Sequence, residues 1–183
     1  MLILEKDSSA LLFVDVQEKL TPHVNHAEQL VSRCTWLMRL AQALEVPVLI
    51  CEQYPSGLGQ TVEPLRTLAA PYSPIEKVHF SCYRSDAFRE QWRQLSKKQL
   101  VIAGIETHVC VLQTAIDMQS QSDHEIFVVV DAVSARSELD HKYGLKRMKQ
   151  AGIQLVTSEM VFFEWVEQAG TKEFKTLSQA FLR

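Results

Sequence analysis

The sequence has few residues of the kinds that cross-link a chain or break its regular structure. Its 183 residues include only four cysteines, six glycines and six prolines. No Cys-x-x-Cys pair occurs among the cysteines, which are Cys34, Cys51, Cys82 and Cys110. This spacing argues against a zinc ribbon and against a disulfide framework. Free thiols are therefore expected, and one of them can serve as a catalytic nucleophile.

An excess of positive charge and a long apolar run are also absent. Lys and Arg number 19 against 22 Asp and Glu, and no basic run is longer than Lys97-Lys98, so we expect no nucleic-acid partner. No apolar run approaches the ~20 residues of a membrane-spanning helix, and the N-terminus lacks the basic region of a signal peptide. We expect a cytoplasmic protein that has no membrane partner.

The length predicts one globular domain over residues 1–183, because chains usually divide only above roughly 250 residues. A domain of this size buries about 70% of the surface that its unfolded chain exposes. It needs neither a metal ion nor a disulfide bond in order to fold.

Apolar runs of strand length alternate with longer amphipathic segments, a pattern typical of βαβ units. The strand candidates are 10–16, 46–51, 99–103, 125–130 and 153–157, with a weaker sixth at 75–79. Continuously apolar strands suit a parallel sheet that is covered on both faces. The sequence therefore predicts an α/β fold, a three-layer α/β/α sandwich with a doubly wound, mostly parallel sheet of about six strands.

Helical periodicity marks four of the intervening segments, 27–44, 86–95, 107–120 and 139–151. Residues 52–74 contain most of the prolines, so we expect a long, partly helical loop there. The aromatic-rich tail, 158–183, is expected to be ordered against the rest of the domain.

Polar residues at the carboxyl ends of the strands are the first functional candidates, because ligands bind at that edge of a doubly wound sheet. Asp15 follows the apolar run LLFV and needs either a partner or a function, since a buried carboxylate is costly alone. Lys77 lies among apolar residues after the proline-rich loop. Taken singly, Asp15 can be a turn residue and Lys77 a solvated surface charge.

Cys110 is placed near the start of a helix that follows a buried strand. Thr107 is a suitable N-cap, which would put Cys110 in the first helical turn. The positive end of a helix favours a thiolate, so we expect the pKa of Cys110 to be lowered. Without the other two residues, an ordinary core cysteine is the alternative.

Four motifs resemble one known family when they are taken in order. They are Asp15-Val-Gln17, then Lys77 with Ser81-Cys-Tyr83, then Gly104-Ile-Glu-Thr-His-Val-Cys110-Val-Leu-Gln-Thr-Ala115, and finally Asp131-Ala132 with Ser134. The third is long enough to be specific. The chain is thereby identified as similar to the isochorismatase-like cysteine hydrolases, a superfamily that includes nicotinamidases, N-carbamoylsarcosine amidases and maleamate amidases.

The resemblance implies an Asp-Lys-Cys triad formed by Asp15, Lys77 and Cys110. It implies that Cys110 attacks a small amide or related C–N substrate to give a thioester, with Asp15 carrying the proton. It also assigns the oxyanion hole to the backbone N–H groups of Glu106 and Cys110, and a cis peptide bond to Ile105-Glu106.

The chain departs from the family pattern after its second strand. Metal-binding nicotinamidases have Asp-x-His there, whereas this sequence reads Glu52-Gln53-Tyr54. We therefore expect no metal and no other cofactor. These three residues, together with Gln17, are candidates for substrate contact, with a loop anchor as the alternative for the three. Phe80 and Tyr83 are candidates for an apolar wall of the site, with core packing as the alternative.

Two other functions remain open on the sequence. An isochorismate-type vinyl ether hydrolase would use Asp15 as proton donor and leave Cys110 idle, whereas a non-catalytic scaffold would carry a vestigial triad. The family resemblance further implies a homo-oligomer, a dimer or larger, with the aromatic tail as one possible contact surface.

Overall fold

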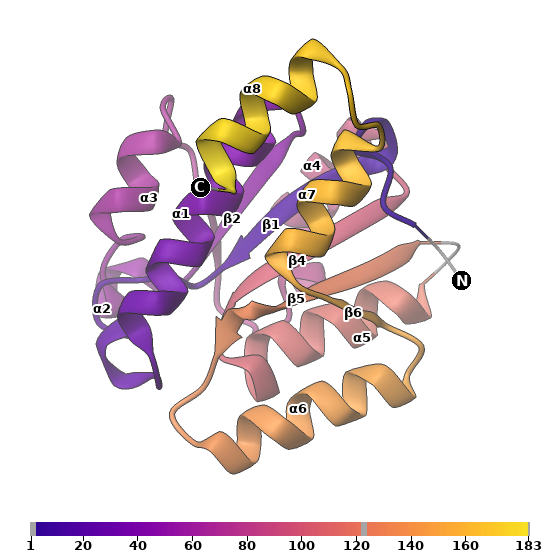
Figure 1. Cartoon of the computed structure of the whole chain (residues 1–183). Helices are drawn as coiled ribbons and strands as arrows, with labels where there is room; N and C mark the ends of the chain where they lie inside the picture. Colours follow the sequence, from indigo (N-terminus) through magenta and orange to yellow (C-terminus); the bar gives the residue numbers. More distant parts are fainter. Residues whose placement is uncertain (1–2, 122–123, 183) are drawn as a thin grey trace.

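A parallel sheet of six strands forms the middle layer of the fold (Figure 1). This computed structural model describes residues 3–121 and 124–182. The strands are β1 (Ser9–Val14), β2 (Val48–Gln53), β3 (Ile75–Lys77), β4 (Gln99–Ile105), β5 (Glu125–Ser134) and β6 (Gln154–Val156). Their order across the sheet is β3-β2-β1-β4-β5-β6, and all neighbours pair in parallel. The predicted doubly wound α/β sheet is confirmed.

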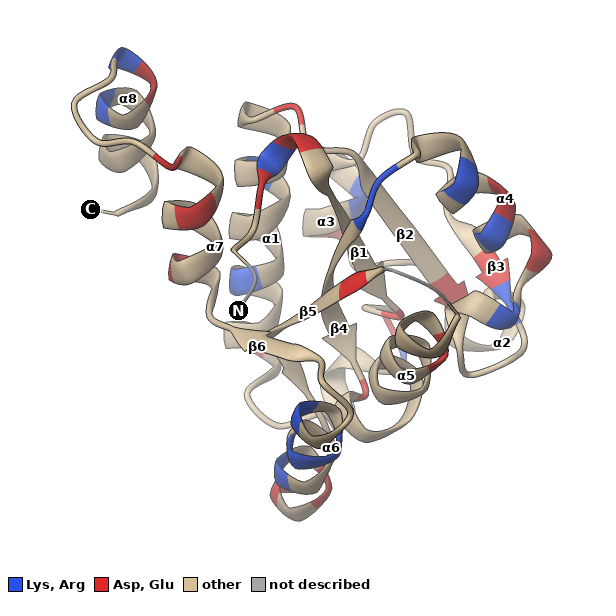
Figure 2. Ribbon diagram, turned by 90° about the vertical axis from the view of Figure 1, so that its right-hand side faces the viewer, with Lys and Arg blue, Asp and Glu red and all other residues tan. Residues whose placement is uncertain are grey.

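Helices cover both faces of this sheet. One side carries α1 (Ala27–Ala43), α3 (Glu63–Leu68), α7 (Ser158–Val166) and α8 (Lys172–Phe181), and the other carries α4 (Asp86–Leu95), α5 (Leu112–Ser120) and α6 (Glu138–Gln150). Figure 2 shows α1, α7 and α8 on the opposite side of the sheet from α4 and α5. Short helical turns complete the chain at η1 (Lys6–Ser8), η2 (Thr21–His23), α2 (Pro55–Leu58), η3 (Cys82–Arg84) and η4 (Thr107–Val111).

The two central strands, β1 and β4, are buried along their whole length. Their apolar side chains enter both helical layers, which explains why these runs lack the alternation of a half-exposed strand. The chain winds outward in opposite directions from this pair, so the polar residues that follow β1 and β4 meet at one edge.

Gly104 allows β1 and β4 to approach closely near that edge. It pairs with Val14 and has a backbone φ of +118°. A Cβ atom at this position would lie 2.1 Å from the carbonyl oxygen of Val14. Only glycine fits both the conformation and the space, which gives this residue of the third motif a structural reason.

Some element boundaries differ from the sequence-based prediction. Strand β5 continues past Val130 to Ser134, because Asp131 interrupts the apolar run without ending the strand. Strand β2 begins and ends two residues later than expected, at Val48–Gln53. The proline-rich segment is partly helical, as expected, and contains α2 and α3. Within the described residues, no helix is both long enough and apolar enough to span a membrane.

The aromatic tail forms α7 and α8 and packs mainly on its own domain. Phe162 and Trp165 are fully buried in the core beneath α1, whereas Phe163 remains about half exposed. Trp36 of α1 donates a hydrogen bond from Nε1 to the carbonyl of Phe181 at 3.1 Å, which attaches the last helix. The tail therefore covers the sheet, and Phe163 is the strongly exposed aromatic residue among those that the structure describes there.

Candidate active site

Three of the predicted site residues come together at the carboxyl edge of the sheet. Asp15 directly follows β1, Lys77 is the last residue of β3, and Cys110 lies in the helical turn η4 after β4. Lys77 crosses the end of β2 to reach Asp15, because β2 lies between β1 and β3. Lys77 and Cys110 lie 62 and 95 positions after Asp15 in the sequence, and the fold brings all three into one site.

Asp15 and Lys77 form a buried ion pair. The Nζ atom of Lys77 donates to Oδ2 of Asp15 at 2.7 Å, and the two side chains are 0% and 1% exposed, respectively. Burial raises the pKa of Asp15 above its ordinary value, although the Lys77 charge opposes that rise. Burial alone would lower the pKa of Lys77, but the charges of Asp15 and of the neighbouring thiols outweigh it and raise this pKa. Lys77 therefore keeps its proton, and Asp15 becomes a stronger proton acceptor.

The backbone at Asp15 turns sharply to present its carboxyl group. Its φ is +53°, in the left-handed region that aspartate tolerates better than most residues. The N–H of Asp15 donates to the carbonyl of Cys51 at 3.0 Å, and the N–H of Gln17 donates to the carbonyl of Asp15 at 2.7 Å. Asp15 is therefore a turn residue, as the alternative interpretation held, and it is also one member of a buried ion pair.

One oxygen of Asp15 is left for the third residue. Among the described residues, no group makes a hydrogen bond of ordinary geometry to Oδ1, which is buried. Outside the ion pair, the thiol of Cys110 and the backbone of Gln53 both interact with the carboxyl group and lower the pKa of Asp15. The carboxylate thus lies between an ammonium and a thiol.

The expected lowering of the Cys110 pKa is wrong. The residue is only 7% exposed, and burial raises the pKa of its thiol, helped by the negative charge of Asp15. Lys77 opposes this rise without reversing it. Burial and the neighbouring Asp15 carboxylate outweigh the effect of a position near the helix start. At rest the thiol is protonated, and Asp15 is the group beside it that can accept the proton.

The helical start before Cys110 also differs from the prediction. Residues Thr107–Val111 form a π-helical turn, and Glu106, not Thr107, occupies the cap position. The hydroxyl of Thr107 instead lies 2.9 Å from Nδ1 of His141 in α6. Cys110 still lies in the first turn of the helical segment, which continues directly into α5.

The loop between β4 and Cys110 is held by its own backbone. The peptide bond between Ile105 and Glu106 is cis, as the resemblance implies. The N–H groups of Val109 and Val111 both donate to the carbonyl of Glu106, at 3.0 and 3.3 Å. The carboxylate of Glu106 accepts from the backbone N–H of Arg136 at 2.9 Å and from its guanidinium at 3.1 Å. These contacts fix the chain on both sides of the predicted oxyanion donors.

His108 is partly buried and lies against α6. Gly144 of α6 faces its backbone, and a Cβ there would lie 3.1 Å from the Cα of His108. The backbone and Cβ of His108 are therefore part of the contact between η4 and α6. His108 does not form a dyad with Cys110 on one helical face, because residues two apart point in opposite directions.

Among the candidates for substrate contact, Gln17 and Glu52 bond to the loop after β2 instead. The buried amide of Gln17 accepts from the N–H of Gln53 at 2.7 Å and donates to the carbonyl of Gly59 at 2.7 Å. The buried carboxylate of Glu52 accepts from the backbone N–H and the hydroxyl of Thr61 at 2.5 and 2.8 Å, and from the hydroxyl of Tyr72. Both residues anchor the loop after β2, which favours the loop-anchor alternative for Glu52 and gives Gln17 the same structural role.

The aromatic candidates are available to a ligand to different degrees. Tyr54 and Phe80 are 57% and 54% exposed, so core packing is wrong for Phe80. Tyr83 is half-buried, with the guanidinium of Arg89 5.8 Å above its ring. A cavity of about 400 Å³ is lined by Tyr54 and Lys77, together with Pro55, Ser56, Glu76, Val78, His79 and Ser85. This cavity thus adjoins the end of β3, where Lys77 is the last residue.

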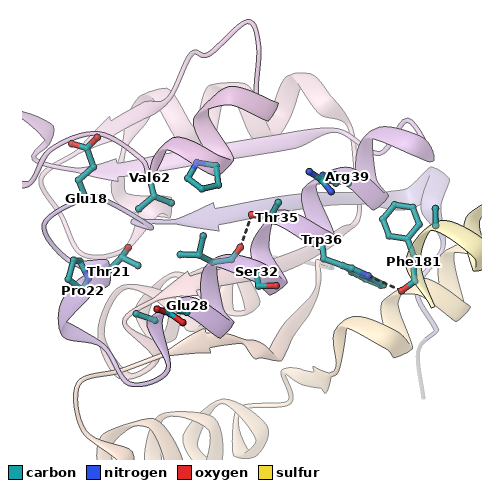
Figure 3. A pocket seen from close by; sticks show the side chains of 14 residues that line it. Glu18, Thr21, Pro22, Glu28, Ser32, Thr35, Trp36, Arg39, Val62 and Phe181 are labelled. Atoms are coloured by element: carbon teal, nitrogen blue, oxygen red, sulfur yellow. Dashed lines mark hydrogen bonds between the residues drawn. The ribbon is translucent and has the colours of Figure 1, made fainter. Parts of the chain in front are cut away.

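A larger cavity lies away from the three residues. It measures about 780 Å³ and runs along α1 between α3 and the end of α8, past Glu18, Val31, Trp36, Arg39 and Phe181 (Figure 3). None of Asp15, Lys77 and Cys110 lines it. Its walls are mostly apolar, and its few charged groups do not meet at one point, so size alone does not mark the catalytic site.

Thr114 and Asp131 make structural contacts that were not predicted from the sequence. The N–H of Cys82 donates to the hydroxyl of Thr114 at 2.9 Å, which joins the third motif to the second. Asp131 accepts from the N–H and hydroxyl of Ser158 at 2.8 and 2.6 Å, and so ties β5 to α7. Thr114 and Asp131 belong to the quoted motifs, and that was the available signal.

No group of three or more His, Cys, Asp or Glu side chains is placed to hold a metal ion in the part of the chain that the structure describes. All four cysteines carry free thiols. The neighbouring thiol of Cys82 raises the pKa of Lys77, and burial together with Cys82 raises the pKa of Cys51.

Comparisons with known proteins identify the family of this chain. Residues 9–160 match the isochorismatase domain family. Isochorismatase domain-containing protein 2A of Mus musculus is 38% identical over 174 residues, which cover 94% of this chain and 82% of the mouse protein.

Solved structures give the same result. A protein of Caenorhabditis elegans described as MAR1 ribonuclease is 33% identical, with a TM-score of 0.91, and the match covers 100% of this chain and 93% of that one. The YcaC gene product of Escherichia coli, described as an octameric hydrolase of unknown specificity, is 27% identical with a TM-score of 0.90, covering 100% and 92%. With a family match over most of its length, this chain belongs to the isochorismatase-like hydrolase family.

Proposed function

We propose that the protein is a cysteine hydrolase that cleaves a small amide or related C–N bond through a thioester. The observation that carries the proposal is the placement of the Asp15 carboxyl group between the Lys77 ammonium and the Cys110 thiol. A protonated thiol beside a carboxylate of raised pKa is suited to give up its proton during attack and not before.

In the first half of the reaction, the Cys110 sulfur attacks the amide carbon as its proton moves to Asp15. The carbonyl π electrons move onto oxygen, and the resulting oxyanion is stabilised by the backbone N–H groups of Glu106 and Cys110. When the tetrahedral species collapses, the C–N bond breaks. Asp15 then gives the proton to the departing nitrogen, and a thioester remains on Cys110.

In the second half, water attacks the thioester. Asp15 takes a proton from that water, and collapse of the tetrahedral species releases the acid and a Cys110 thiolate. The thiolate recovers its proton from Asp15, which restores the starting state. Throughout, Lys77 keeps a positive charge beside both the carboxylate and the sulfur, which limits the cost of negative charge in a buried site.

The surroundings favour a small substrate that has an apolar part. Tyr54, which lines a cavity together with Lys77, exposes more than half of its surface, and so does Phe80, three residues after Lys77 in the sequence. Gln17 and Glu52 are occupied internally and are not proposed as substrate contacts. The proposed reaction needs no metal or organic cofactor, since the three side chains supply nucleophile, base and cation.

A panel of small aliphatic and aromatic amides, assayed with the parent protein and with Cys110→Ala, tests the proposal. We expect hydrolysis of at least one amide by the parent and none above background by the variant. Hydrolysis that persists in Cys110→Ala would contradict a thioester route.

A vinyl ether hydrolase of the isochorismate type is the second candidate. It would use Asp15 as the proton donor and would not need Cys110. If Cys110→Ala retains ether hydrolysis while Asp15→Asn abolishes it, this function replaces the amidase. The thiol beside Asp15 favours the amidase, because an ether hydrolase gives that thiol no role.

A non-catalytic scaffold and RNA cleavage can be tested on the same samples. The name of the C. elegans relative suggests RNA as a substrate, but in this chain acidic and basic residues alternate on α4 without forming one basic face (Figure 2). A scaffold predicts no acylation of Cys110 by any acyl donor. RNA cleavage that survives Cys110→Ala and Asp15→Asn would place an activity outside this site.

We also propose that the chain forms a homo-oligomer and works in the cytoplasm. The octameric E. coli relative and the exposed apolar side chains Phe80 and Phe163 support assembly. Four free thiols support a reducing compartment. Light scattering of the purified protein tests the first statement, and a monomer at micromolar concentration would contradict it.

A further inference from the structure

Gln53 makes contacts that differ from those of a substrate-binding residue. It is the last residue of β2, directly opposite Lys77 of β3 in the sheet register. Its Oε1 accepts from Nζ of Lys77 at 2.7 Å, and its Nε2 donates to the carbonyl of Val78 at 2.8 Å. Both ends of the amide are therefore committed to protein partners.

These two partners fix the orientation of the amide. A backbone carbonyl can only accept a hydrogen bond, and an ammonium can only donate one. The flipped amide would place its NH₂ against the ammonium and its oxygen against the carbonyl, which loses both bonds. The Gln53 oxygen therefore faces Lys77.

Gln17 in turn fixes the backbone of Gln53. Its Oε1 accepts from the N–H of Gln53 at 2.7 Å, and its Nε2 donates to the carbonyl of Gln53 at 3.0 Å and to that of Gly59 at 2.7 Å. Gln17 is fully buried, so water does not compete for these bonds. The two glutamines form a continuous connection from the turn after β1, through β2, to the ammonium of Lys77.

We propose that Gln53 is a positioning residue that holds the Lys77 ammonium beside Asp15 and Cys110. The lysine side chain has four flexible methylene groups, and a single bond to Asp15 would leave Nζ free to pivot about that contact. The second hydrogen bond, to Gln53 on the neighbouring strand β2, fixes the position of Nζ. This inference rests on the proposed function, since it concerns the cation of the same triad.

The charges that act on Lys77 come from several elements. They are Asp15 after β1, Cys82 in η3 and Cys110 in η4, and all three raise the pKa of the ammonium. Lys77 in return lowers the pKa of Cys110 and of Cys51. Gln53 adds no charge, so it can hold the ammonium without competing with the thiolate for it.

The experiment is a double-mutant cycle on the alkylation of Cys110 by iodoacetamide at pH 8, followed by peptide mass spectrometry. Gln53→Met keeps the length of the side chain and removes its hydrogen bonds. We expect Gln53→Met to slow alkylation about tenfold, the effect of one unit of thiol pKa. In the Lys77→Met background, we expect the same change to alter the rate by less than about twofold, because a residue acting through Lys77 has nothing left to position.

Gln42→Met is the matched control. Gln42 also donates its amide to a backbone carbonyl, that of Leu68 at 2.6 Å, but lies away from the site at the end of α1. We expect no change in alkylation. Equal slowing by Gln53→Met in the parent and Lys77→Met backgrounds would overturn the proposal, because a purely structural role acts in both. Faster alkylation in Gln53→Met would also overturn it, because Gln53 would then hold Lys77 away from the thiol.

A second measurement covers the case in which the doubly substituted protein does not fold. Reductive methylation at pH 8 reports the accessibility and protonation of each lysine. We expect Lys77 to be labelled at least about fivefold faster in Gln53→Met, because an ammonium that loses an acceptor is less strongly protonated. Exposed Lys142 should be labelled at the parent rate. An unchanged rate at Lys77 would overturn the proposal.

The measurements use no substrate, so they separate two kinds of failure. If coupling between Gln53 and Lys77 is found but no amide is hydrolysed, the positioning inference stands and the amidase proposal fails. If amides are hydrolysed and no coupling is found, only the positioning inference fails.

Discussion

Two buried carboxylates, Asp15 and Glu52, lie at the ends of neighbouring strands and have different surroundings. Both are almost fully buried. Glu52 accepts hydrogen bonds from uncharged donors of Thr61 and Tyr72. Asp15 is paired with an ammonium and adjoins a thiol. Burial alone therefore does not identify a catalytic carboxylate, and the neighbouring groups decide its role.

Two adjacent residues of β2, Glu52 and Gln53, differ in a similar way. Glu52 and Gln53 point to opposite faces of the strand, as successive strand residues do. Glu52 contacts the loop that contains Thr61, and Gln53 contacts Lys77. A substitution of Glu52 should therefore affect stability, whereas a substitution of Gln53 should affect the reactivity of the site.

The largest effect is expected from Asp15→Asn. Removing the proton carrier should lower kcat for amide hydrolysis by about 10²–10⁴-fold, the usual contribution of general acid–base catalysis. The same substitution removes the negative charge that raises the pKa of Cys110, so alkylation of the thiol should become faster. A kinetic assay and an alkylation assay on one sample check the fall in kcat and the rise in the alkylation rate. Slower alkylation would contradict the assigned role of the charge.

Lys77→Met should produce the largest loss of stability. It leaves the buried Asp15 carboxylate without its cation, and breaking such a pair costs about 3–5 kcal/mol. Urea unfolding followed by circular dichroism measures the change. A loss below about 1 kcal/mol, the value typical of exposed ion pairs, would mean that the pair is not buried in solution.

Glu52→Gln should separate the two carboxylates. We expect the free energy of unfolding to fall by about 1–3 kcal/mol, because donors from Thr61 and Tyr72 lose a charged acceptor. The rate of Cys110 alkylation should stay within about twofold of the parent, since the side chains belong to different networks. A tenfold change in the alkylation rate would show that Glu52 belongs to the site and would contradict the difference between the Asp15 and Glu52 carboxylates.

A smaller effect is expected from alkaline pH. The pKa of Cys110 is raised in the folded protein, so above pH ~8.5 the unfolded chain loses this proton while the folded chain keeps it. The contribution to stability is therefore complete below that pH and is lost as pH rises. Between pH 8.5 and 10, the free energy of unfolding should fall more steeply in the parent than in Cys110→Ala, by up to about 1.4 kcal/mol per pH unit. Equal slopes would contradict the raised pKa.

Much of the fold followed from local patterns that can be seen in the sequence. The runs around Leu12 and Ile102 are continuously apolar because both faces of β1 and β4 are buried, and the strands were predicted on that basis. Where one residue interrupts a run, the pattern misleads, as Asp131 did in β5. Its carboxylate is satisfied by Ser158, 27 residues later, and no local pattern contains that information.

The site was predictable in its residue types but less so in its electrostatics. The motif spacing brought attention to Asp15, Lys77 and Cys110, and the structure places them together. The sign of the Cys110 pKa shift depends on burial and on the distance to Asp15, which sequence position does not give. The role of Gln53 was missed for the same reason, because its partner Lys77 is 24 residues away and on another strand.

The central claim is that Cys110 is acylated and then deacylated, and burst kinetics with a small activated ester, p-nitrophenyl acetate, test it most directly. The account predicts a rapid release of about one nitrophenolate per chain, acetyl mass on the Cys110 peptide, and a slower steady state, all absent in Cys110→Ala. Steady release at the same rate in the parent and in Cys110→Ala, with no acetyl group on the peptide, would contradict it.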